Sequence, residues 1–207
     1  MQVLHSFPDF NFLRTHYPQI KTILWDMDGT VLDTEKLHFE SIFALISTPD
    51  CVQSFKEFCH GKIDSEVFDH LLEANLIQET DLDGFLNEKE IKLRELIQST
   101  PLDEILAPSL REFITQLRDN QFKQAIVTSS ERITTDFSLK VTNILGLFDL
   151  IITREDTPEN KPSPMPYQHA MRTLGVNPET VLIFEDSEVG HLAATKSGAQ
   201  VVKAAWY

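Results

Sequence analysis

Several features that define other classes of protein are scarce in this 207-residue chain. It has two cysteines, Cys51 and Cys59, which are too few for a disulfide framework or a cysteine-based metal cluster. It contains no run of about eighteen uncharged apolar residues, so no membrane span is expected. The first residues lack the basic region and apolar core that are typical of a signal peptide. We therefore expect a cytoplasmic protein with reduced thiols.

Positive charge is also scarce. The chain holds 18 lysines and arginines against 32 aspartates and glutamates, which gives a formal net charge of −14 at pH 7. A nucleic-acid-binding protein needs a basic surface, so no nucleic acid is expected as a partner. An acidic surface also disfavours binding to anionic membranes. If the substrate is an anion, a metal ion or a local lysine must offset this charge.

The distribution of apolar residues divides the chain into three regions. Residues 1–20 are rich in aromatic side chains but show no clear period, so they are expected to form an N-terminal arm of unknown role. Residues 34–105 carry apolar side chains at helical spacing and no convincing strand. Residues 21–33 and 106–207 alternate between strands and helices. This pattern predicts an α/β fold, a Rossmann-like doubly wound parallel sheet, with a helical block inserted after the first strand.

The alternation also predicts particular elements. The expected strands cover residues 22–26, 122–128, 149–153, 180–184 and 200–202, and the expected helices cover 109–118, 131–145, 164–174 and 188–197. Ser163 is the expected N-cap of the third of these helices, and Gly146, Gly175 and Gly198 are expected to end helices. In the helical block, Asp83-Gly84 is expected to form a turn between helices.

Chemically active side chains follow the predicted strands. In open α/β sheets, ligands bind beyond the carboxyl ends of the strands. Asp26 and Asp28 follow the first strand, and alternate residues of an extended chain face the same way. Later strand ends carry hydroxyls, a lysine and two further acids, namely Thr128, Ser129, Ser130, Lys161, Glu185 and Asp186. We expect all of these side chains to meet on one rim of the sheet.

These residue types favour a phosphate group bridged to a metal ion. Clustered carboxylates suit Mg²⁺, a hard cation that takes oxygen ligands. Two carboxylates as close as Asp26 and Asp28 repel each other unless a cation lies between them or one holds a proton. Hydroxyls and free N–H groups at the start of a helix, as predicted over residues 128–130, can hold a phosphate. Lys161 would add a positive charge to the same place.

Four segments together resemble the signatures of the haloacid dehalogenase-like superfamily, over about residues 22–202. The segments that carry this resemblance are Asp26-Met27-Asp28-Gly29-Thr30, Thr128, Lys161-Pro162 and Phe184-Glu185-Asp186-Ser187. Residues 34–105 are similar to the small α-helical cap of the phosphatase and β-phosphoglucomutase branch. The resemblance implies that this cap closes, excludes water and selects the substrate.

The resemblance implies a Mg²⁺-dependent phosphatase that acts on a small phosphorylated metabolite. Asp26 would be the nucleophile that forms an aspartyl-phosphate, and Asp28 would be the general acid and base. The implied phosphate-binding residues are Gly29, Thr128, Ser129 and Lys161. The implied metal ligands are Asp26, Asp186 and the backbone carbonyl of Asp28, with Glu185 nearby.

Other functions share parts of the pattern. Dehalogenases of this superfamily lack the second aspartate, so Asp28 disfavours that activity. A sugar-phosphate mutase of the β-phosphoglucomutase type shares the first half-reaction. However, the segment 63–65 has no arginine where the mutase cap binds a second phosphate, although Lys62 is adjacent. A phosphoacceptor signalling domain places its aspartate after a middle strand and has no inserted cap. Lys36, His60 and Lys62 are candidate substrate contacts, and neither the substrate nor the oligomeric state is predicted.

Overall fold

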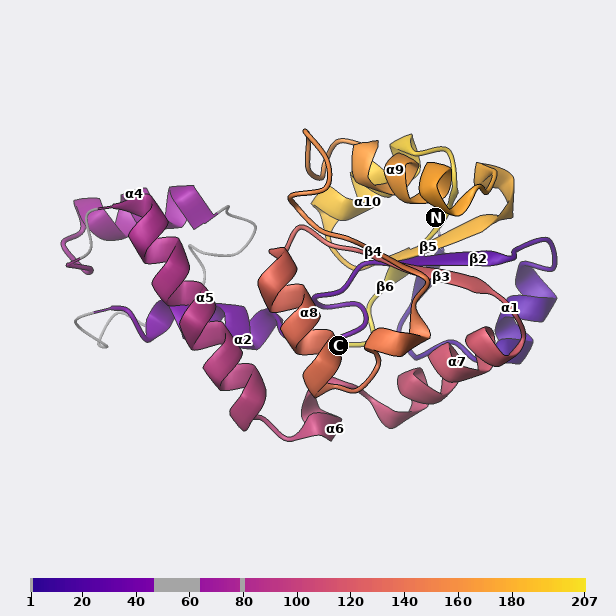
Figure 1. Ribbon diagram of the computed structural model, residues 1–207, viewed down its shortest axis with the longest axis horizontal. Helices are drawn as coiled ribbons and strands as arrows, with labels where there is room; N and C mark the ends of the chain where they lie inside the picture. Colours follow the sequence, from indigo (N-terminus) through magenta and orange to yellow (C-terminus); the bar gives the residue numbers. More distant parts are fainter. Residues whose placement is uncertain (1, 47–63, 79–80) are drawn as a thin grey trace. The chain divides into compact units, whose positions relative to one another are not determined.

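The computed structural model describes residues 2–46, 64–78 and 81–207 (Figure 1). The chain divides into two compact units. One comprises Met1–Asp33 together with Pro101–Tyr207, and the other comprises Thr34–Thr100. The short helix α6 (Leu102–Ile105) belongs to the first unit, whereas the sequence analysis placed it in the helical block.

The first unit is built on a six-stranded sheet in the order β1-β6-β5-β2-β3-β4. The strands are β1 (Gln2–Leu4), β2 (Thr22–Trp25), β3 (Lys123–Val127), β4 (Leu150–Ile152), β5 (Val181–Glu185) and β6 (Gln200–Ala204). Every pairing is parallel. The predicted α/β fold with a parallel sheet is therefore confirmed. Because β2 pairs with β3 on one side and β5 on the other, Asp26, which follows Trp25, lies between the ends of two neighbouring strands.

Helices cover both faces of this sheet (Figure 1). They are α1 (Phe10–His16), α7 (Pro108–Asp119), α8 (Arg132–Val141), α9 (Met165–Leu174) and α10 (Glu188–Lys196), with short 3₁₀ turns at Leu145–Leu147 and Pro178–Thr180. Alternate residues of β2 point to opposite faces. Leu24 packs in the cluster that α9 and α10 share with the sheet, whereas the ring of Trp25 meets Phe113 of α7. Both faces of β2 are buried, which explains its unbroken apolar sequence.

The N-terminal segment, expected to be an arm without a known role, is part of the sheet. β1 pairs with β6 and forms the edge of the sheet. Helix α1 begins at an N-cap, where the carboxylate of Asp9 accepts a hydrogen bond from the N–H of Phe12 at 2.7 Å. Its Leu13 is buried, and Phe10 meets Phe122 edge-on. A strand of three residues carries no detectable alternation, so the sequence pattern could not reveal it.

Several helix ends differ from the sequence-based predictions. Helix α8 stops at Val141 because Asn143 adopts a left-handed conformation, with φ 54°, before Gly146 is reached. Helix α9 begins at Met165, so Ser163 lies one position outside the N-cap, although its hydroxyl still accepts from the N–H of Met165 at 3.3 Å. Gly175 ends that helix with φ 65°, as expected.

The second unit contains α2 (Glu35–Phe43), α4 (Asp64–Glu73) and α5 (Leu82–Ser99), and no strand occurs among its described residues. Its buried cluster is formed by Ile42, Val67, Phe68, Leu71, Ile77 and Phe85. The turn expected at Asp83-Gly84 is instead the first turn of α5, because the carboxylate of Asp81 caps the helix by accepting from the N–H of Gly84 at 3.1 Å. Lys36 is exposed in this unit. Cys51, Cys59, His60 and Lys62 lie outside the described residues.

Within residues 2–46, 64–78 and 81–207, no helix is both long and apolar enough to cross a bilayer.

Candidate active site

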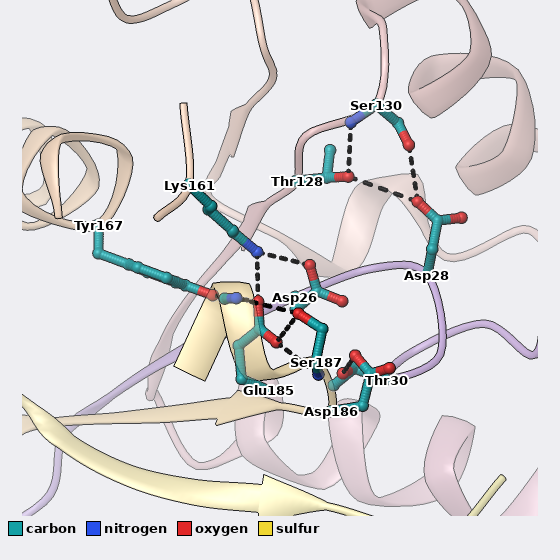
Figure 2. Close-up of polar contacts among 11 residues, drawn as sticks. Asp26, Asp28, Thr30, Thr128, Ser130, Lys161, Tyr167, Glu185, Asp186 and Ser187 are labelled. Atoms are coloured by element: carbon teal, nitrogen blue, oxygen red, sulfur yellow. Dashed lines mark hydrogen bonds and ion pairs between the residues drawn. The ribbon is translucent and has the colours of Figure 1, made fainter. Parts of the chain in front are cut away.

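The strand ends that the sequence analysis singled out meet at one rim of the sheet. The N–H of Asp26 continues the pairing of β2 by donating to the carbonyl of Phe184 at 3.0 Å. The N–H of Thr128 donates to the carbonyl of Ile152 at 2.9 Å in the same way. Because these strands are parallel, their carboxyl ends lie side by side, and the side chains that follow them form the two groups shown in Figure 2.

The first group is centred on a buried lysine. Nζ of Lys161 donates to Oδ1 of Asp26 and to Oε1 of Glu185, each at 2.6 Å. The side chains of these three residues are 5, 11 and 0% exposed, respectively. The peptide bond between Lys161 and Pro162 is cis. Ion pairs with so little solvent around them are screened weakly, so this cation fixes the place of both carboxylates.

Glu185 is bonded through both of its carboxylate oxygens. Oε1 accepts from the hydroxyl of Tyr167 at 3.1 Å as well as from Lys161. Oε2 accepts from the N–H of Ser187 at 3.0 Å and from its hydroxyl at 3.1 Å. Nζ of Lys161 also lies 5.0 Å from the centre of the Tyr167 ring. Glu185 therefore holds Lys161 and the loop at the start of α10 in fixed positions.

Three acids of this group are close enough to share a cation. Carboxylate oxygens of Asp26, Glu185 and Asp186 all lie within 4.8 Å of one another. The set offers only oxygen donors, and Asp186 is partly exposed while the other two are buried. Oxygen donors with access to water suit Mg²⁺, which keeps several water ligands when it binds to a protein. The residues present therefore fit a magnesium ion.

The second group holds the side chain of Asp28. Its Oδ2 accepts from the hydroxyl of Ser130 at 2.7 Å, and the hydroxyl of Thr128 lies 3.5 Å away from the same oxygen. The N–H of Ser130 in turn donates to the hydroxyl of Thr128 at 3.0 Å. Asp28 is half-buried, so it remains open to solvent on one side. Ser129, which was predicted as a phosphate contact, is exposed, and it is Ser130 whose hydroxyl meets Asp28.

Two glycines leave room for the carboxylates of Asp186 and Glu185. Gly29 has φ 77°, and a Cβ at this position would lie 2.4 Å from Oδ2 of Asp186. A Cβ at Gly190 would lie 1.6 Å from Oε1 of Glu185. Real Cβ atoms do not approach oxygen so closely, so any larger residue would displace these carboxylates. At Gly29, the structure thus reveals a packing requirement in addition to the predicted phosphate contact.

Burial and neighbouring charges shift the pKa values of the first group. Burial raises the pKa of Asp26 well above its usual value, and Glu185 and Asp186 add to this rise while Lys161 opposes it. Burial alone would lower the pKa of Lys161, but the negative charge of Asp26 raises it well above its usual value. Burial also raises the pKa of Tyr167, whose hydroxyl therefore keeps its proton. The site thus contains a permanent cation, which lowers the cost of bringing an anion into it.

Three residues of the site were given no role by the sequence analysis, namely Thr30, Tyr167 and Ser187, and Ser130 was predicted only as part of the phosphate-holding segment 128–130. Thr30 donates from its hydroxyl to Oδ1 of Asp186 at 3.0 Å. Thr30 and Ser187 belong to the signature-like segments, and Ser130 belongs to the hydroxyl cluster, so their positions were marked in the sequence. Tyr167 had no such signal, because it looks like one more apolar residue of a helix.

Comparisons with known proteins point to one family. A family model described as haloacid dehalogenase-like hydrolase matches residues 23–204. The pyrophosphatase PpaX of Oceanobacillus iheyensis is 29% identical over 193 residues, which cover 90% of this chain and 84% of that protein. The phosphoglycolate phosphatase of Nitrosospira multiformis is 27% identical over 194 residues, with coverage of 90% and 84%.

Solved structures show the same architecture. CbbY from Rhodobacter sphaeroides, in complex with phosphate, is 25% identical, with a TM-score of 0.72 and coverage of 88% of this chain and 85% of that one. A HAD hydrolase of family IA, variant 3, from Entamoeba histolytica is 24% identical, with a TM-score of 0.75 and coverage of 89% and 83%. The family match spans most of the chain and includes all four signature-like segments. The resemblance inferred from the motifs is therefore confirmed, and the chain belongs to the haloacid dehalogenase-like hydrolases.

Proposed function

We propose that this hydrolase is a Mg²⁺-dependent phosphatase that cleaves a small phosphorylated metabolite through an aspartyl-phosphate. The observation that carries the proposal is the buried contact of Lys161 with Asp26, beside the carboxylates of Glu185 and Asp186. A carboxylate paired with a buried cation and flanked by acids is suited to phosphoryl transfer, because charge on the transferred group must be neutralised. Relatives named as a pyrophosphatase and a phosphoglycolate phosphatase support the same reaction class.

In the first half-reaction, a carboxylate oxygen of Asp26 forms a bond to phosphorus. The bond between phosphorus and the ester oxygen breaks, and its electron pair stays on the departing oxygen. Asp28, in its protonated form, gives that oxygen a proton. Asp28 suits this role because its side chain is half-buried, with one oxygen held by Ser130. The products are an alcohol and phosphorylated Asp26.

In the second half-reaction, a water oxygen attacks the same phosphorus. Asp28, now a carboxylate, accepts a proton from that water, and the bond between Asp26 and phosphorus breaks. Inorganic phosphate leaves, and both aspartates return to their initial states. Lys161 and the hydroxyl of Thr128 would hold the phosphoryl oxygens throughout both steps.

A magnesium ion would be held by Asp26, Asp186 and the backbone carbonyl of Asp28, with Glu185 beside them. When bound, Mg²⁺ would supply positive charge that offsets the charge of the phosphoryl group and of the surrounding acids. Glu185 would act mainly by orienting Lys161, since its oxygens already accept bonds from Lys161, Tyr167 and Ser187.

The direct test is phosphate release from a generic aryl phosphate, measured with and without Mg²⁺. Asp26→Asn should reduce kcat by about three orders of magnitude or more, because the amide is a poor nucleophile and a poor metal ligand. Asp119→Asn, an equally conservative change at the exposed end of α7, is the matched control and should keep wild-type activity. Near-normal turnover by Asp26→Asn would show that the nucleophile has been assigned wrongly.

The mutase alternative is separated from the phosphatase by its products. A mutase of the β-phosphoglucomutase type would move phosphate from one position of a hexose phosphate to another, whereas a phosphatase releases inorganic phosphate. Incubation with hexose phosphates, followed by measurement of both products, distinguishes them. Isomerised hexose phosphate in excess of free phosphate would favour the mutase.

A further inference from the structure

Two aromatic residues at the C-terminal end of the chain contact the loop that follows β2. Trp206 and Tyr207 both lie beyond residues 23–204, the span that matches the family. Nε1 of Trp206 donates to the backbone carbonyl of Thr30 at 2.9 Å. The hydroxyl of Tyr207 donates to the carbonyl of Val31 at 3.3 Å. Both contacts lie within the unit that contains the sheet.

The fold of this loop explains why these donors are needed. The N–H groups of Thr30, Val31 and Leu32 all point to one carbonyl, that of Met27, at 3.3, 2.9 and 2.9 Å. Thr30 and Val31 are both 0% exposed. A buried carbonyl without a donor is costly. The carbonyls of Thr30 and Val31 therefore depend on the hydrogen bonds from Trp206 and Tyr207.

Packing fixes the orientation of the indole ring. The centroid of the Trp206 ring lies 5.6 Å from that of Phe7 and 5.8 Å from that of Phe184. Phe184 in turn stacks on Trp25, with centroids 4.7 Å apart. Trp206 is therefore held between the N-terminal segment and β5, the strand that leads into Glu185. Aromatic contacts at these distances limit rotation of the ring and so keep its N–H directed at Thr30.

Thr30 links this contact to the site. Its backbone carbonyl accepts from Trp206, and its side-chain hydroxyl donates to Oδ1 of Asp186 at 3.0 Å (Figure 2). A residue held at its carbonyl presents its hydroxyl at a fixed point. We propose that Trp206 is a positioning residue that acts through Thr30 to orient Asp186, and that it thereby strengthens the binding of Mg²⁺. This inference rests on the assignment of Asp186 as a metal ligand in the proposed function.

The first experiment measures Mg²⁺ binding directly. MgCl₂ is titrated into the full chain by isothermal titration calorimetry, so that the readout does not depend on turnover. Trp206→Phe keeps an aromatic ring but removes the N–H donor, and it should weaken Mg²⁺ binding about fivefold, the effect expected from losing one net hydrogen bond. Tyr207→Phe removes a neighbouring donor to the same loop and is the matched control, with an expected change of less than about twofold.

A double-mutant cycle tests the route through Thr30. Thr30→Val removes the hydroxyl that binds Asp186 but keeps the shape of the side chain. If Trp206 acts through Thr30, adding Trp206→Phe to Thr30→Val should change Mg²⁺ affinity little further. Fully additive effects would overturn the proposed route, as would equal weakening by Tyr207→Phe. Trp206→His, whose ring can still donate an N–H, should bind Mg²⁺ more tightly than Trp206→Phe does.

The wild-type protein separates failure of this inference from failure of the proposed function. If the wild type neither binds Mg²⁺ nor releases phosphate from aryl phosphates, the function itself is wrong. If the wild type does both and folded Trp206→Phe binds Mg²⁺ equally well, only the positioning role is wrong. Circular dichroism confirms folding of each variant before titration.

Discussion

Asp26 and Asp28 are two residues apart in the chain but lie in different surroundings. Asp26 is buried beside Lys161 and two other acids, whereas Asp28 is half-buried and meets hydroxyl groups. In the proposed mechanism, the fixed positive charge beside Asp26 suits a nucleophile, and the half-buried position of Asp28 suits a general acid and base. The surroundings of the two carboxylates, rather than their own chemistry, would then set their different roles.

The largest effect is expected where the buried cation is removed. Lys161→Met would leave Asp26 and Glu185 buried without a positive partner, and this should lower the free energy of unfolding by about 3–5 kcal/mol and abolish phosphate release. Urea unfolding without Mg²⁺ measures the loss. Lys140→Met, on the exposed part of α8, is the control and should change stability by less than about 0.5 kcal/mol. Unchanged stability in Lys161→Met would show that the ion pairs contribute little.

The next effect concerns the space around Glu185. In Gly190→Ala, a Cβ would lie 1.6 Å from Oε1 of Glu185 and must displace it, so a loss of about 1–3 kcal/mol is expected, together with weaker activity. Gly146→Ala is the matched control, because a Cβ there meets nothing within 4 Å. Thermal unfolding of both variants compares them. Equal stabilities would mean that the first turn of α10 at Gly190, or the side chain of Glu185, moves aside without cost.

On the side of Asp28, activity should respond more than stability. Ser130→Ala removes the hydroxyl that Asp28 accepts from at 2.7 Å, so kcat should fall about tenfold, while stability changes by no more than about 1 kcal/mol. Ser129→Ala, at the exposed neighbouring position, should leave kcat unchanged. Steady-state kinetics on an aryl phosphate test both. If Ser129→Ala were the slower variant, the predicted role of Ser129 in phosphate binding would be favoured over a role for Ser130.

The smallest effect lies in the loop before Lys161 and depends on pH. Burial acts to raise the pKa of Asp156, but hydrogen bonds from Thr153 and the charge of Arg132 lower it overall. A lowered folded-state pKa means that Asp156 stabilises the fold above about pH 4, and that this contribution is lost as pH falls through the folded-state value. Because the side chain is 32% exposed, solvent limits the contribution to below about 1 kcal/mol.

Asp156→Asn checks this dependence. Its deficit in unfolding free energy relative to the wild type should be present at pH 7 and should shrink below about pH 4. Urea unfolding at several pH values measures the difference. A deficit that stayed constant down to the lowest pH would mean that the charge of Asp156 has no part in it.

The sequence predicted the parts of the fold and site that depend on patterns along the chain. The apolar run before Asp26 predicted a buried central strand, and the order of strand ends predicted that Lys161 and Glu185 would lie near it. Features that depend on side-chain direction or on distant contacts were missed. The bond from Ser130 to Asp28 depends on the direction of that hydroxyl, and the bond from Tyr167 to Glu185 needs α9 to pack on the sheet. The end of α8 at Val141 depends on Asn143 adopting a conformation usually taken by glycine.

The lengths of the outermost strands have a consequence for behaviour at high concentration. β1 and β4, at the two edges of the sheet, contain three residues each, whereas β2, β3, β5 and β6 contain four or five. An exposed edge is a template on which another chain can add a strand, and a short edge offers few free backbone groups for it. Because both edge strands are short, this sheet has few unpaired backbone groups at its edges, and this limits aggregation through edge-to-edge pairing.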